Sequence, residues 1–141
     1  MIIQQVSIFL ENKSGRLVEV TEALAEAGVN ISALSIAETS DYGVLRCVVS
    51  HPQKAMDLLK AKHFSARLTD VICMATPNQP GALHRCLKIL ADANISVEYM
   101  YAFAIGDRAL VVIRTDNIRE TISVLQHHKV DLLKSSELYQ V

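Results

Sequence analysis

The stretches "NKSGRL" at residues 12–17 and "NQPGAL" at residues 78–83 decide the fold, because both have the pattern Asn-x-x-Gly-x-Leu. Each stretch closes an apolar run with strand character and opens a run with helical spacing. The two start 66 residues apart, and the same shift without a gap aligns Gly15 with Gly81 and Leu17 with Leu83. The match continues over nearly the whole chain, which predicts one supersecondary unit used twice.

Each unit is predicted to run strand, helix, strand, strand, helix, strand. First strands are expected at residues 4–10 and 70–76, and hairpins at 31–38 with 42–50 and 97–104 with 109–115. Leu17, Val20 and Leu24 share a face of the first helix, and Gly28 and Asn94 are expected as left-handed C-caps. Second helices are expected at 52–62 and 117–128, and last strands at 65–69 and 132–138.

This order predicts an α+β fold of two ferredoxin-like βαββαβ repeats, with antiparallel sheets and both helices of each repeat on one face. Right-handed crossovers should place the first and third strands of each repeat centrally. We expect repeat 1 at residues 1–70 and repeat 2 at residues 71–141, joined without a spacer. The strand at 97–104 is apolar on both sides, so a homodimer is expected to cover it.

Composition excludes several function classes. The 141 residues carry a formal net charge of −1 with both signs interspersed, which disfavours nucleic acid and membrane partners. There is no signal peptide pattern and no apolar run of membrane-span length, so a cytoplasmic location is expected. The three cysteines form no CxxC motif and are expected to be small buried hydrophobes, and the adjacent pair His127 and His128 makes a poor metal site. No catalytic constellation occurs, so we expect neither an enzyme nor a cofactor.

The element order, the repeated Asn-x-x-Gly-x-Leu junction and the segments "AEAGVNI" and "ADANISV" resemble ACT domains, two in tandem over essentially the whole chain. The resemblance implies a regulatory module of amino-acid metabolism that binds a free amino acid between two ACT units, and a partner that is an enzyme or regulator of that metabolism. It is the resemblance that supplies this ligand class.

The chemistry of the junction agrees with such a ligand. A helix N-terminus offers unpaired N–H groups to a carboxylate, and Gly15 and Gly81 let the backbone approach it. Asn12 and Asn78 can present a carbonyl to an ammonium group, with Asn30 and Ser96 as second contacts. Strand residues of the neighbouring unit are expected to close the pocket. The predicted ligand-binding residues are Asn12, Lys13, Ser14, Gly15, Arg16, Leu17, Asn30, Leu34, Ser35, Asn78, Gln79, Gly81, Ala82, Leu83, Ser96, Met100 and Tyr101.

Three alternatives stay open at this point. Asn and Gly also serve ordinary strand-to-helix turns, and Ser14 or Asn12 can simply cap a helix. The chain can be an assembly module without a ligand, or an enzyme with an unrecognised site. The repeats also differ, since Ser14 corresponds to Pro80 and Asn30 to Ser96, so the two copies need not bind equally.

Overall fold

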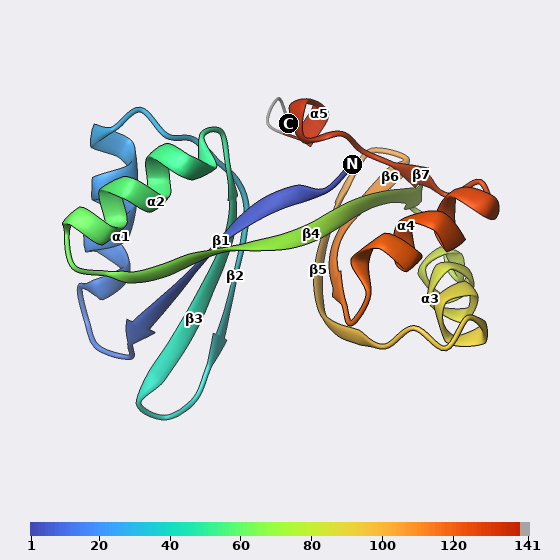
Figure 1. Cartoon of the computed structure of the whole chain (residues 1–141), viewed down its shortest axis with the longest axis horizontal. Helices are drawn as coiled ribbons and strands as arrows, with labels where there is room; N and C mark the ends of the chain where they lie inside the picture. Colours follow the sequence, from blue (N-terminus) through green and yellow to red (C-terminus); the bar gives the residue numbers. More distant parts are fainter. Residues whose placement is uncertain (139–141) are drawn as a thin grey trace. The chain divides into compact units, whose positions relative to one another are not determined.

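Residues 1–138 are described in a computed structural model of the chain (Figure 1). Its internal contacts define two units, which are described separately below. The N-terminal unit is Gln4–Thr69, and the C-terminal unit is Asp70–Leu138 together with Met1–Ile3. None of the helices within residues 1–138 has the length and hydrophobicity of a membrane span.

The N-terminal unit follows the predicted βαββαβ order. Its elements are β1 (Ile3–Glu11), α1 (Arg16–Glu26), β2 (Ile31–Glu38), β3 (Tyr42–Val49), α2 (Pro52–Ala61) and the first part of β4 (Ser65–Pro77). The strands lie in the order β2-β3-β1-β4, with β3 antiparallel to both β1 and β2. The first and third strands are therefore central, as the crossover rule predicts.

One face of this sheet carries the N-terminal core. Alternate residues of β1 point the same way, so Val6, Ile8 and Leu10 pack with Leu45 and Cys47 of β3. The helices α1 and α2 cover this face (Figure 1), and their buried side chains include Val20, Leu24, Ala55, Met56 and Leu59. Leu17, expected on the same face of α1, is not part of this core: it lies in the first turn of the helix and is 39% exposed.

The C-terminal unit repeats this arrangement. Its elements are the rest of β4, α3 (Ala82–Asp92), β5 (Val97–Ile105), β6 (Arg108–Thr115), α4 (Ile118–His127), β7 (Asp131–Leu132) and α5 (Ser135–Leu138). Here β4 and β6 are central, β5 pairs with β6 and β7 pairs with β4. Ile72, Met74, Val111 and Ile113 face the helices and form the core with Leu90 and Leu125. The predicted fold of two ferredoxin-like repeats is confirmed.

Three local expectations need correction. The predicted strands 65–69 and 70–76 form the single strand β4, because no turn residue separates them. Of the predicted last strand at 132–138, only Leu132 is in a strand, since β7 covers Asp131–Leu132. After it, the Lys134 N–H donates to Glu137 Oε2 at 2.7 Å, a capping contact that starts the short helix α5 and ends the strand pairing.

The first residues of the chain belong to the C-terminal unit. Gln126 Nε2 of α4 donates to Met1 Sδ at 3.1 Å, and the side chain of Ile3 is fully buried. The C-terminal unit thus contains both ends of the described chain, although most of its residues follow Asp70.

Candidate ligand-binding loops

The first loop, residues 12–17, is built on a glycine with a left-handed backbone. Gly15 has a φ of 91° and directly precedes α1, so the chain turns sharply from β1 into the helix. The Asn12 N–H donates to the Asp41 carbonyl at 2.7 Å, and Asn12 Nδ2 donates to the Ser40 carbonyl at 3.3 Å. Both bonds fix this loop to the turn between β2 and β3.

The second loop, residues 78–83, has the same construction. Gly81 has a φ of 85° and directly precedes α3. The Asn78 N–H donates to the Asp107 carbonyl at 2.8 Å, and Asn78 Nδ2 donates to the Gly106 carbonyl at 3.2 Å. In both loops the asparagine amide nitrogen is therefore used by the adjacent hairpin turn. Its carbonyl oxygen is the atom left to meet a ligand ammonium group.

The helices that follow these loops begin without a side-chain cap. Neither α1 nor α3 has a side-chain oxygen accepting from its first N–H groups, whereas Asn117 Oδ1 accepts from the Glu120 N–H at the start of α4. The alternative that Ser14 or Asn12 caps α1 is thus wrong. The Arg16 N–H donates to the Lys13 carbonyl and the Ala82 N–H to the Gln79 carbonyl. The next N–H groups of each helix, together with the positive end of its dipole, are the ones that can meet an anion.

The charged residues of the first loop are already paired. Lys13 Nζ lies 3.3 Å from Glu11 Oε2, and Arg16 Nη1 lies 2.6 Å from Glu19 Oε2. The Arg16 guanidinium also lies over the Phe64 ring, with its carbon 4.8 Å from the ring centre. Lys13 and Arg16 were predicted as ligand contacts, and any ligand must compete with these partners for them.

The remaining loop residues differ in exposure. Ser14 and Gln79 are exposed, whereas Ala82 is only 3% exposed and Leu83 packs partly against the C-terminal core. Ala82 and Leu83 therefore offer a ligand mainly their backbone.

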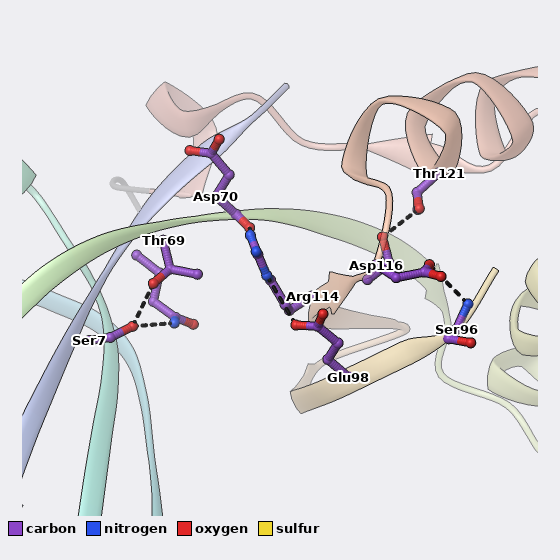
Figure 2. A network of polar contacts seen from close by, with 10 residues as sticks. Ser7, Thr69, Asp70, Ser96, Glu98, Arg114, Asp116 and Thr121 are labelled. Atoms are coloured by element: carbon purple, nitrogen blue, oxygen red, sulfur yellow. Dashed lines mark hydrogen bonds and ion pairs between the residues drawn. The ribbon is translucent and has the colours of Figure 1, made fainter.

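Asn30 and Ser96 do not share an end of the sheet with the loops of their own unit. The Asn30 N–H donates to Ser50 Oγ at 2.9 Å, where β2 begins and β3 ends. The Ser96 N–H donates to Asp116 Oδ1 at 3.1 Å at the equivalent place (Figure 2). The loops lie at the other end, beside the hairpin turns. Within one unit, the predicted second contact is therefore separated from the loop by the length of a strand.

The four strand candidates lie on two edge strands and point to opposite faces. Leu34 of β2 is opposite Cys47, and Met100 of β5 is opposite Ile113, so both face the helix side. Ser35 and Tyr101 face the other side. Leu34 is 50% exposed and Met100 37% exposed, which leaves apolar surface on the helix side of each edge.

Figure 2 shows polar contacts that the sequence reasoning did not find. In the N-terminal unit Ser7 Oγ lies 2.9 Å from Thr69 Oγ1. In the C-terminal unit Arg114 donates from Nη1 to the Asp70 carbonyl at 2.7 Å and from Nε to Glu98 Oε2 at 3.3 Å. These residues lie on strands with alternating polar and apolar positions, which was the available signal. Their contacts join neighbouring strands, and none of these residues belongs to either loop.

The cysteines and the potential metal ligands are the remaining candidates for chemistry among the described residues. Burial raises the thiol pKa of Cys47 and of Cys73 to about 12, so neither is a reactive thiolate at neutral pH. The predicted burial of the cysteines is confirmed. No group of three or more His, Cys, Asp or Glu side chains in residues 1–138 can hold a metal ion.

A depression of about 380 Å³ lies between the C-terminal halves of α3 and α4. Its lining residues are Ile89, Asp92, Ala93, Ser123, Val124, His127 and His128. None of them was predicted as a ligand contact, and none belongs to either loop.

A family model described as an ACT domain pair matches residues 1–141. The chain belongs to this family. The resemblance drawn from the two junctions is thereby confirmed, and the repeats are those of an ACT domain pair. No protein with a curated description matches the chain.

Solved structures give the same fold for this ACT domain pair. Protein BT0572 from Bacteroides thetaiotaomicron is 52% identical with a TM-score of 0.97, over 100% of this chain and 98% of that one. The regulatory subunit of aspartate kinase from Thermus thermophilus, in its ligand-free form, is 13% identical with a TM-score of 0.65, over 89% and 93% of the two chains. The corresponding subunit from Thermus flavus is 16% identical with a TM-score of 0.61, over 89% and 92%. At these identities the two Thermus proteins show likeness of fold alone.

Proposed function

We propose that this ACT domain pair is a non-catalytic regulatory sensor that binds a free amino acid at loop 12–17, at loop 78–83, or at both. The observation that carries the proposal is the helix start without a side-chain cap after a left-handed glycine, built twice with the same asparagine contacts. The family supplies the ligand class, and two structural neighbours are regulatory subunits of an amino-acid kinase by name.

The loop chemistry suits both charged groups of an amino acid. Backbone N–H groups near Gly15 or Gly81 bind the carboxylate, because they are oriented along the helix axis and reinforced by the dipole. The side-chain carbonyl of Asn12 or Asn78 accepts from the ammonium group, since the amide nitrogen is held by the hairpin turn. Apolar strand residues such as Leu34 and Met100, contributed by another unit or subunit, contact the ligand side chain.

Regulation then follows from differential binding. A ligand that contacts two units favours the arrangement in which both contacts are made, and it shifts the equilibrium only by its affinity difference between arrangements. We propose that a homodimer in the cytoplasm passes this shift to an enzyme or regulator of amino-acid metabolism.

A thermal-shift screen of the twenty amino acids tests the proposal. Ligand at one hundred times its dissociation constant should stabilise the chain by roughly 2.7 kcal/mol. Isothermal calorimetry on the hit then gives affinity and stoichiometry. If no amino acid shifts the melting temperature at millimolar concentration, the sensor proposal is wrong.

The exposed apolar surface favours a second candidate, a ligand-free assembly module. Phe9 and Tyr42 are 50% and 46% exposed, and their rings stack with centres 5.0 Å apart. Leu34 and Ile36 on the edge strand β2 are also about half exposed, at 50% and 47%. Surface of this kind is typical of protein contacts. Tight self-association without any amino acid response would favour this candidate.

A further inference from the structure

An aromatic pair lies on the face of the N-terminal sheet that the helices do not cover. Phe9 of β1 and Tyr42 of β3 stack with ring centres 5.0 Å apart and ring planes 24° apart. Alternation along the two strands directs both rings away from the core residues Ile8 and Leu45. The rings are 50% and 46% exposed, so a large part of their apolar surface is open to contact.

The second repeat forms the same fold without these rings. The 66-residue shift places Ala75 and Arg108 at the positions of Phe9 and Tyr42. There β4 pairs with β6 in the same register as β1 pairs with β3. The ring pair is therefore not required to build the βαββαβ unit, and contact with a partner accounts for its exposure.

Three carboxylate side chains lie at the same end of the sheet as the rings. Glu11 is opposite Tyr42 in the strand register and lies two residues from Phe9, on the same face of β1. Glu38 is the last residue of β2, and Asp41 directly precedes β3. All three are exposed, so a partner that contacts the rings also meets negative charge.

Few cations balance these carboxylates. Lys13 Nζ lies 3.3 Å from Glu11 Oε2 and neutralises one of them. Neither Glu38 nor Asp41 forms an ion pair with a cation among residues 1–138. Arg46, which is on the same face of β3 as the rings, lies further along the strand. The surface around the rings is therefore negatively charged and favours a positively charged partner.

This charge distinguishes between two possible occupants of the surface. A twofold contact between copies of the chain would bring the carboxylates of one copy close to the same carboxylates of the other, which is unfavourable. An arginine side chain instead suits both features of the surface. Its planar guanidinium stacks on aromatic rings, and its N–H groups donate to carboxylates.

We propose that the surface formed by Phe9, Glu11, Glu38, Asp41 and Tyr42, which we call the aromatic patch, binds an arginine-containing segment of a partner protein. One guanidinium of the segment stacks on the rings and donates to the carboxylates beside them, and apolar side chains of the segment cover the remaining ring surface. This binding needs no free amino acid. It goes beyond the proposed function, because it states the chemistry by which a partner recognises the N-terminal unit.

The test uses a short fluorescein-labelled peptide in which arginine and leucine alternate. Its binding to the full chain is measured by fluorescence anisotropy at low and at physiological ionic strength. Two further peptides replace every arginine by lysine or by glutamate. The arginine peptide should bind most tightly and lose affinity as salt is added, the lysine peptide should bind more weakly because it cannot stack in the same way, and the glutamate peptide should not bind.

The first pair of variants tests the rings. Phe9→Ala combined with Tyr42→Ala removes both rings and keeps every charge. Its control is Leu34→Ala combined with Ile36→Ala, which removes two side chains that are 50% and 47% exposed on the helix side of the same sheet. We expect the affinity for the arginine peptide to fall about tenfold in the ring variant and to stay unchanged in the control.

The second pair tests the carboxylates and keeps the rings. Glu11→Gln combined with Glu38→Gln should weaken binding about tenfold and reduce its salt dependence. Its control is Glu22→Gln combined with Glu26→Gln, which neutralises two exposed glutamates of α1 and changes the net charge equally. This control should bind like the wild type.

Three results would overturn the inference. They are wild-type affinity in the ring variant, no binding of the arginine peptide to the wild type, and a wild-type dimer that sediments as a monomer once both rings are removed. The last result would assign the aromatic patch to a second copy of the chain. None of these results depends on an amino acid, so the proposed sensor function stands or falls by its own screen.

Discussion

Alanine substitution at three glycines with a left-handed backbone can distinguish a loss of ligand binding from a loss of stability caused by backbone strain. Gly81, Gly15 and Gly28 have φ values of 85°, 91° and 70°. A Cβ at Gly15 or Gly28 meets no atom within 4 Å, and a Cβ at Gly81 meets only the flexible end of Arg85. Alanine therefore fits sterically at all three positions. The cost that the three variants share is the free energy of holding a non-glycine residue at a positive φ.

The magnitude follows from two opposing terms. A non-glycine residue in this region costs about 1–3 kcal/mol, and the reduced entropy of the unfolded chain offsets about 0.4–1 kcal/mol of that. We expect each variant to lose about 1–2 kcal/mol of unfolding free energy, measured by urea denaturation. Gly28 ends α1 and lies in neither loop, so it is the control.

Calorimetry with the amino acid found in the screen then distinguishes the variants. Gly81→Ala should abolish binding at the second loop, because its methyl group enters the space beside the Arg85 guanidinium at the start of α3. Gly15→Ala should likewise abolish binding at the first loop, and Gly28→Ala should bind like the wild type because this glycine lies in neither loop. Wild-type affinity in Gly81→Ala would refute the assignment of the site to this loop, even if its stability fell as expected.

Further expectations concern the core, the thiols and assembly. Leu59→Ala and Leu125→Ala, at corresponding positions of the two repeats and both fully buried, should each cost about 2–5 kcal/mol in denaturant unfolding, and a cost below about 1 kcal/mol would contradict their core placement. Because burial raises the thiol pKa of Cys47 and Cys73 from 9.0 to about 12, the unfolded chain loses these protons first, so stability should be retained below pH 9 and fall between pH 9 and pH 12. Replacing both cysteines by alanine should flatten that part of the stability profile. Sedimentation should show a dimer at micromolar concentration, and a monomer with and without amino acid would remove the homodimer from the proposal.

The sequence predicted the repeated architecture because its signals are local and occur twice. Gly28 and Asn94 end their helices with positive φ values of 70° and 58°, as a C-cap requires. His63 and Lys129 take the same conformation, at 66° and 58°, and were not predicted because neither residue type signals it. Their equivalence under the 66-residue shift was the signal that could have found them.

The candidate site was less predictable than the fold. The bend at Gly15 and Gly81 follows from residue type, but the use of the Asn12 and Asn78 amides by the hairpin turns depends on contacts 28 residues away in the chain. The place of Arg85 beside Gly81 likewise depends on a side-chain conformation that periodicity does not specify. Sequence patterns therefore located the loops, and the coordinates were needed to tell them apart.

The place of Met1–Ile3 in the C-terminal unit has a consequence for synthesis on the ribosome. These residues are made before Asp70–Leu138, which form the rest of the unit that buries Ile3. While residues 4–69 are emerging, Met1–Ile3 therefore have no native packing partner. Their native packing follows the synthesis of residues that lie about half a chain further on, so the C-terminal unit closes by joining two distant segments.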